Sequence, residues 1–200
     1  KYICVQIQED LDNSLLFASK DGKKTLQTAI SYLESRSLPH LLTEIGKERI
    51  RLAAKKIKDE TGVNIDYGFR VYRLADSNMQ DVYYRPQDYK QETLNMFADN
   101  IKPDRTADDL LAQVMLDWGL PLSYKIEQLD IDGKRVFRVA QDSLLACFDK
   151  GIDEAFAKAV AKEKPLRVVF RDSGFASDTA KINVQQLLKQ LSPETEMKVI

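Results

Sequence analysis

The chain has 200 residues, of which 44% are apolar and 30% are charged, enough for one large domain or two small ones. Its 30 basic and 31 acidic side chains give a formal net charge of −1. No overall positive field therefore attracts nucleic acid, and any DNA contact requires a local basic patch. The sequence contains no run of about 18 apolar residues, which argues against a membrane span, and it does not begin with a signal peptide. We therefore expect a cytoplasmic protein.

The first segment has the pattern of a β-strand. Residues 2–7 alternate large apolar side chains with small or polar ones, and the acidic run Glu9-Asp10-Leu11-Asp12 follows. A domain seldom starts inside a sheet, and the first residue is Lys1 rather than Met. We therefore expect the chain to be part of a longer protein. Residues 13–42 are polar and are interpreted as an insertion with a helix near residues 25–35.

Residues 43–60 predict a helix with two distinct faces. One face is apolar at helical spacing and is expected to pack; we call it the outer stripe, Ile50, Ala53, Ala54 and Ile57. The neighbouring face spans roughly 80° and is basic; we call it the basic stripe, Lys47, Arg51, Lys55 and Lys58. The basic stripe is a candidate DNA contact, because each phosphate that it neutralises contributes to affinity. A solvated helix face is the alternative interpretation.

The middle of the chain is less regular. Residues 68–75 predict a second strand, and Asp76-Ser77-Asn78 after it are expected to form a loop that caps the strand. Residues 76–105 predict a long loop with a short helix near 91–100. Within that loop, Tyr83, Tyr84, Arg85 and Tyr89 mix aromatic rings with a cation, as nucleic-acid surfaces and packed interfaces both do. Residues 107–118 then predict an amphipathic helix.

The last 80 residues predict a small mixed sheet with helices, in the order β-β-β-α-β-α-β. The dipeptide Asp132-Gly133 indicates a tight hairpin between the first two strands, because a type I′ turn needs positive φ at both central residues. In the closing helix, Asn183 is the expected N-cap, with Gln186 three residues later, and Ile182 and Leu187 are the expected hydrophobic staple.

Three blocks of sequence, in a fixed order, resemble a known family. They are KYICVQIQE with IGKERIRLAAKKI, then GFRVYRLADSN, and then the stretch from WGLPL through DGKRVFRV and SLLACFD to RVVFRDSGFASDTAKINVQQLLKQLSPETEMKVI. In this order the blocks resemble the C-terminal region of the modification (Mod) subunit of type III restriction-modification systems. That subunit is a DNA adenine-N6 methyltransferase that uses S-adenosylmethionine.

The resemblance implies an α/β fold: the end of a Rossmann-like methyltransferase sheet in residues 1–78, a loop and helical connector in residues 79–118, and a small mixed-sheet α/β assembly domain in residues 119–200. It also implies Gln6 and Glu9, or nearby Gln8, as candidate cofactor contacts near the ribose hydroxyls; solvent-exposed strand-end residues are the alternative. By the same resemblance, Asp76-Ser77-Asn78 is a candidate contact with the adenine end of the cofactor, with the capping loop as the alternative. The implied partners are a second Mod subunit, the Res helicase-nuclease subunit and double-stranded DNA.

The family's catalytic Asp-Pro-Pro-Tyr motif and its Phe-x-Gly-x-Gly cofactor loop do not occur between Lys1 and Ile200. We therefore expect the chain by itself to be inactive and to have a structural, assembly and DNA-contact role. The alternatives are a non-enzymatic α/β interaction module that shares this C-terminal domain, and a subunit of another modification system with a similar tail.

Other features of the sequence favour structural roles. Arg171-Asp172-Ser173 has no histidine in a pattern that supplies a general base, and His40 is the only histidine and has no metal-ligand spacing. Cys4 and Cys147 both lie in apolar, strand-like sequence and are expected to act as small hydrophobic residues.

Overall fold

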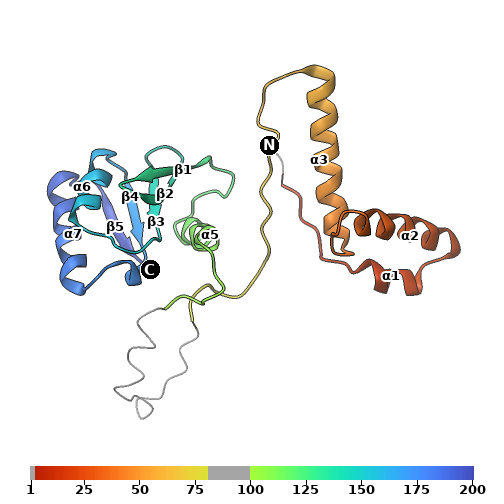
Figure 1. Cartoon of the computed structure of the whole chain (residues 1–200), viewed down its shortest axis with the longest axis horizontal. Helices are drawn as coiled ribbons and strands as arrows, with labels where there is room; N and C mark the ends of the chain where they lie inside the picture. The colour runs from red at the N-terminus through yellow and green to blue at the C-terminus, as the bar shows by residue number, and fades with distance from the viewer. Residues whose placement is uncertain (1–2, 81–99) are drawn as a thin grey trace, which may run out of the picture. The chain divides into compact units, whose positions relative to one another are not determined.

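The computed structural model describes residues 3–80 and 100–200, and the chain divides into two compact units, Lys1–Arg73 and Leu74–Ile200 (Figure 1). The described residues contain six α-helices and a five-stranded mixed sheet, which confirms the predicted α/β class. The predicted helix near residues 91–100 and the aromatic cluster at residues 83–89 lie outside the described residues, apart from Asn100. No helix in the described ranges is long and apolar enough to cross a membrane.

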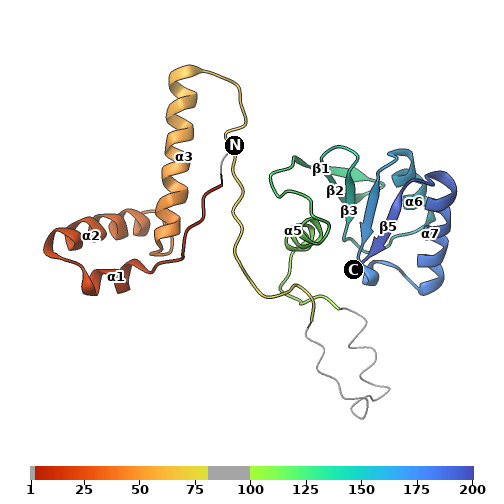
Figure 2. The same ribbon diagram turned by 180° about the vertical axis from the view of Figure 1, so that it is seen from behind.

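The first unit contains three helices, α1 (Leu11–Phe17), α2 (Lys20–Glu34) and α3 (Leu42–Thr61), which we call the helical module. Asp10 and Ser19 cap the first two helices, because each side chain accepts a hydrogen bond from a backbone N–H of the first turn. Gly62 ends α3 in the left-handed conformation with φ 62°. Helices α1 and α2 lie side by side, as Figures 1 and 2 both show.

The core of the helical module is small. Leu11, Ile30 and Leu33 are buried, and α3 adds Leu42 and Ile45 from its first turns. The outer stripe of α3 was expected to pack, yet Ala53 and Ile57 are exposed and Ile50 and Ala54 are only partly buried. The face that packs in this unit is a different one, and it carries Leu42 and Ile45.

Two predicted strands are not formed by the chain itself. Residues 3–9 and 62–75 are without strand structure, which corrects the prediction of strands at residues 2–7 and 68–75. A strand needs a neighbour for its backbone hydrogen bonds, and no described strand pairs with either segment. Their apolar side chains are consequently exposed, including Ile3, Val5, Ile7, Val71 and Leu74.

The second unit is built around the sheet. After helix α5 (Ala107–Asp117), the strands are β1 (Ile126–Ile131), β2 (Lys134–Val139), β3 (Leu144–Cys147), β4 (Arg167–Phe170) and β5 (Glu196–Val199). They lie in the order β1-β2-β3-β4-β5, with the first three antiparallel and the last three parallel. Helix α6 (Glu154–Lys162) connects β3 to β4, and α7 (Asp178–Leu191) connects β4 to β5. The predicted order β-β-β-α-β-α-β is therefore confirmed.

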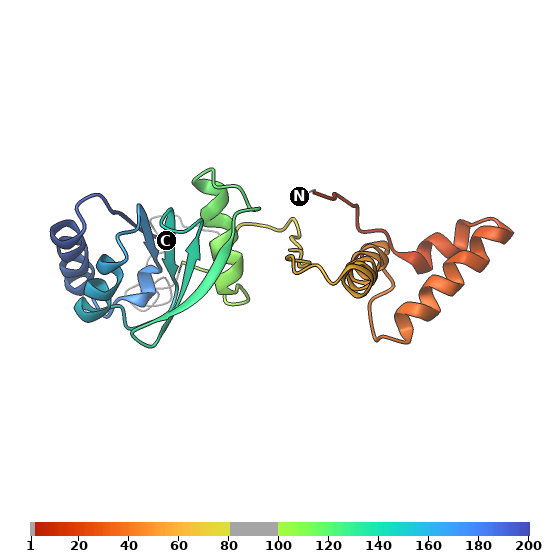
Figure 3. The same cartoon turned by 90° about the horizontal axis from the view of Figure 1, so that it is seen from above.

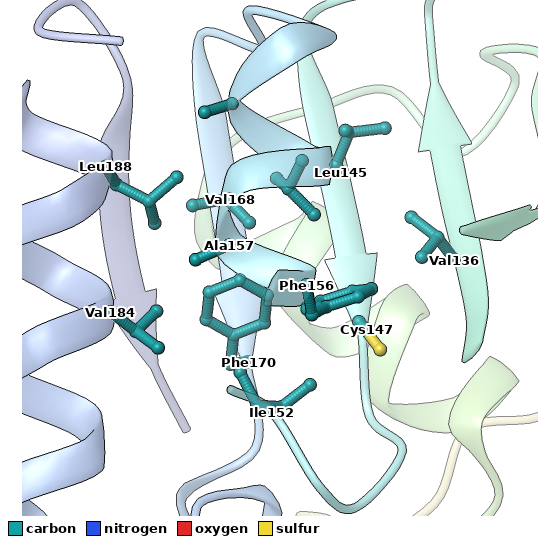
Figure 4. Close-up of a cluster of buried hydrophobic side chains, with 12 residues drawn as sticks. Val136, Leu145, Cys147, Ile152, Phe156, Ala157, Val168, Phe170, Val184 and Leu188 are labelled. Carbon is teal, nitrogen blue, oxygen red and sulfur yellow. The ribbon is translucent and has the colours of Figure 1, made fainter. Parts of the chain in front are cut away.

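The sheet has a hydrophobic core on each face. On one face, α5 packs through Leu111 and Met115 against Phe137 and Val169. On the other face, α6 and α7 cover Val168 and Phe170, so the unit has three layers (Figure 3). Figure 4 shows side chains of α6 and α7 pointing toward those of β4. Phe170 makes edge-on ring contacts with Phe156 and Phe175, at centroid distances of 6.0 and 5.8 Å.

Of two local predictions made from the sequence of the second unit, one is confirmed and one is wrong. The Asp132-Gly133 turn is confirmed, with φ of 52° and 73° at its two residues. The predicted start of the closing helix is wrong, because α7 begins earlier, with Ser177 as its N-cap accepting from the N–H of Ala180. Asn183 lies inside the helix, where its amide donates to Glu154.

Candidate functional site

A buried carboxylate organises the helical module. Glu48, on α3, is 5% exposed, and its carboxylate accepts hydrogen bonds from Arg36 at 2.9 Å, from the Tyr32 hydroxyl at 3.4 Å, and from Arg51 one turn further along α3. The hydrogen bond from Arg51, together with the charges of Arg36 and Arg51, holds the pKa of Glu48 below its usual range. These contacts connect α2, the turn after it and α3, and they keep the carboxylate ionised.

The basic stripe is divided into two halves by this arrangement. Lys47 forms an ion pair with Glu44 at 2.5 Å, and Arg51 is held by Glu48. Among the described residues, neither Lys55 nor Lys58 has a carboxylate within ion-pair distance, and both are exposed. The half of the stripe that is available for phosphate therefore lies toward the C-terminal end of α3.

The two candidate cofactor residues lie before α1. Gln6 is exposed, and its amide donates to the neighbouring carbonyl of Ile7 at 3.3 Å. Glu9 accepts from the Ser14 hydroxyl at 2.7 Å, and its backbone carbonyl accepts from the N–H of Leu42 at 3.0 Å. Glu9 thus helps to hold α1 against the start of α3. The role of Gln6 and Glu9 as cofactor contacts stays a prediction.

The loop at residues 76–78 anchors a helix. The side-chain amide of Asn78 donates to the carbonyl of Asp109 at 2.9 Å, and its backbone N–H donates to the side chain of Gln113 at 3.2 Å. Ser77 accepts from the N–H of Met79. These hydrogen bonds favour the loop interpretation of this segment, with Asn78 tied to α5.

The segment Arg171-Asp172-Ser173 lies between β4 and α7 and contacts both the C-terminus and α7. The N–H of Asp172 donates to the carbonyl of Ile200, and its carboxylate accepts from Lys181 of α7 at 2.7 Å. Gly174 follows in close contact with Asp149, since a Cβ at this position would lie 2.9 Å from the Asp149 carbonyl oxygen. The ion pair and the close approach secure the connection between β4 and α7.

His40 and the cysteines have mostly structural explanations. His40 lies 2.8 Å from Asp12, which links the loop before α3 to α1, and no group of three or more metal-ligating side chains occurs in the described ranges. Cys147 is buried in the sheet, and burial raises the pKa of its thiol to about 11. Cys4 is exposed, which corrects its expected hydrophobic role. Its segment has no neighbouring strand to cover it.

The Glu48 cluster is the main site feature that the sequence prediction missed. The spacing of Glu44 with Lys47 and of Glu48 with Arg51, three residues apart on one helix, was a visible signal for the ion pairs of α3. The contribution of Arg36 had no such signal, because it approaches from the turn after α2.

Comparison with known proteins gives no identification. No protein-family model matches the chain, and no curated protein matches it.

Proposed function

We propose that this chain is the C-terminal part of a type III Mod subunit, a site-specific DNA adenine-N6 methyltransferase, and that it completes the methyltransferase sheet of that enzyme. The ordered blocks of sequence carry the resemblance to the family. The structural support is that, among the described residues, no strand pairs with residues 3–7 or 68–75, and that most apolar side chains of these segments, with Ala53 and Ile57 of the outer stripe, are exposed.

The observation that carries the proposal is the exposure of Ile3, Val5 and Ile7. Val5 is 91% exposed, and its neighbours at two-residue spacing are nearly as exposed. A row of solvent-exposed β-branched side chains favours a segment that becomes covered by other strands or helices. The segment at residues 68–75 has the same character, with Val71 and Leu74 exposed.

Helix α3 lies between these two segments in sequence and completes the pattern of a β-α-β unit. In such a unit the helix crosses from one parallel strand to the next and packs its apolar stripe on the sheet. The outer stripe is available for that contact, because Ala53 and Ile57 are exposed. In the intact protein, residues 3–7, α3 and residues 68–75 would then extend a doubly wound sheet by one such unit.

The proposal assigns roles to the candidate residues. In the intact enzyme Gln6 and Glu9 would lie at a strand end, where an amide or carboxylate oxygen accepts hydrogen bonds from the ribose hydroxyls of S-adenosylmethionine. Lys55 and Lys58 would contact DNA phosphates. The methyl transfer itself requires the catalytic motif and the cofactor loop, which this chain does not carry.

The second unit would serve in assembly, with a second Mod subunit and the Res subunit as proposed partners in the cytoplasm. Its support is that the unit has a closed core on both faces of its own sheet. It therefore does not depend on the methyltransferase sheet for its packing. Sedimentation of the chain with intact Mod or Res is expected to show a complex, and no association with either would contradict this role.

Reading the genomic sequence upstream of Lys1 tests the proposal. We expect an in-frame Phe-x-Gly-x-Gly within about 40 residues, since in a doubly wound fold the glycine-rich loop follows the preceding strand, with Asp-Pro-Pro-Tyr further upstream. A start codon directly before Lys1 would contradict the proposal and favour a non-enzymatic interaction module. A different motif order would indicate a subunit of another modification system.

A further inference from the structure

Helices α2 and α3 enclose a groove within the helical module. Its volume is about 560 Å³, and its apolar lining includes Ala29 and Tyr32 of α2 with Ile45 and Leu52 of α3. Leu52 is 50% exposed there. A half-exposed leucine at the end of an apolar groove is typical of a surface that accepts an apolar side chain from another molecule.

The charges around this groove are predominantly positive. Lys24 and Arg49 line it, and within the described part of the chain neither has a carboxylate at ion-pair distance. The one acidic residue in the lining, Glu48, is neutralised by Arg36 and Arg51. The groove therefore combines an apolar floor with two available cations.

Most of the groove's lining on α3 lies opposite the outer stripe, and Arg49 lies at its side, roughly 90° from the centre of that stripe. At about 100° per residue, Ile45, Glu48 and Leu52 lie roughly 150° from the centre of that stripe. A sheet packed on Ala53 and Ile57 therefore leaves the groove open. Binding in the groove therefore does not require the proposed methyltransferase role.

We propose that the groove between α2 and α3 binds an acidic amphipathic helix of a partner protein. Leucine or phenylalanine side chains at helical spacing would insert between Ile45 and Leu52, and aspartate or glutamate beside them would pair with Lys24 and Arg49. Charge complementarity selects an acidic segment over a basic one. The apolar floor favours a peptide over DNA, because a phosphate backbone offers no side chain to fill it.

Fluorescence anisotropy with a labelled probe peptide tests this proposal on the whole 200-residue chain. The probe is a helical peptide of about 14 residues, with leucine at i, i+3, i+4 and i+7 and aspartate or glutamate elsewhere. We expect saturable binding. Leu52→Ser, and separately the double variant Lys24→Glu with Arg49→Glu, should each raise the Kd by about tenfold or more.

The matched control is Ile57→Ser. Ile57 is 48% exposed on the same helix but lies outside the groove, so this variant should change the Kd by less than about twofold. A probe with lysine in place of its acidic residues should not bind. Every variant is expected to retain its helices, because the substituted side chains are at the surface. Circular dichroism checks this.

Four results of the binding assays would overturn the proposal. They are no saturable binding of the acidic peptide, an equal loss of affinity in Leu52→Ser and Ile57→Ser, equal binding of the lysine peptide, and binding of a labelled DNA duplex with the same dependence on Leu52. Self-association through the groove would also overturn it, and would appear as a concentration-dependent mass in sedimentation that Leu52→Ser abolishes.

Discussion

Substituting Val5 by aspartate distinguishes a segment that stays in solvent from one that becomes part of a sheet. In the 200-residue chain Val5 is 91% exposed, so the substitution should change the free energy of unfolding by no more than about 0.5 kcal/mol. In the intact protein a buried valine would contribute about 1.5–3 kcal/mol. An unpaired buried carboxylate would add a cost of at least about 1–3 kcal/mol. The same change should therefore destabilise the intact enzyme by roughly 3 kcal/mol or more.

Urea denaturation followed by circular dichroism measures both effects. Gln8→Asp is the control, because it adds the same charge three residues later, at an exposed position where the predicted strand has ended. In the chain alone, Val5→Asp and Gln8→Asp should have the same free energy of unfolding. In the intact protein, the Val5→Asp variant should be much less stable than the Gln8→Asp variant. Unfolding of the chain itself by Val5→Asp would refute the exposure of Val5 in the chain. Equal stability of both variants in the intact protein would refute its burial in a sheet there.

Four further predictions test other parts of the account. In urea denaturation, Phe170→Ala should destabilise the second unit by about 3–5 kcal/mol, because Phe170 is fully buried between two aromatic rings. The control Ile182→Ala, at a half-exposed site of α7, should have little effect. Gly133→Ala should cost about 1–2 kcal/mol in the same assay, because Gly133 has φ 73°. Iodoacetamide at pH 8 should label only Cys4 in the native chain, and both Cys4 and Cys147 in urea. Burial raises the pKa of Cys147 to about 11 and therefore keeps its thiol protonated in the native state. Labelling of both thiols in the native state would contradict the burial of Cys147. In the intact enzyme, the double variant Lys55→Glu with Lys58→Glu should reduce the magnitude of the slope of log Kobs for DNA binding against log salt concentration by about 2. An equal effect of Lys47→Glu alone would contradict the division of the basic stripe.

The fold of the second unit could be predicted from the sequence because its signals are local. Asp132-Gly133 specifies a tight turn, and the consecutive apolar residues Val168, Val169 and Phe170 specify a buried strand. The error at the start of α7 has a local cause as well. Ser177 and Asn183 are both good capping residues, and the earlier one begins the helix because its hydroxyl accepts from the N–H of Ala180.

The candidate site was harder to predict because its contacts join residues that are far apart in the sequence. Periodicity predicted the outer stripe of α3 as a packing face, but the structure packs a different face, which carries Leu42 and Ile45. Periodicity alone does not state which surface a helix meets. The same limit applies to residues 3–7, whose alternation predicts a strand without naming its neighbour. The Glu48 cluster and the groove beside it arise from the way α2, the turn after it and α3 meet, so they appear only in three dimensions.

Methyl transfer from labelled S-adenosylmethionine to duplex DNA tests the central claim most directly, measured for the 200-residue chain and for the protein encoded by its complete reading frame. The proposal predicts no transfer by the chain alone, transfer to adenine N6 by the complete protein, and loss of that activity in complete protein carrying Val5→Asp. Transfer by the chain alone, or a complete protein that methylates no DNA, would contradict it.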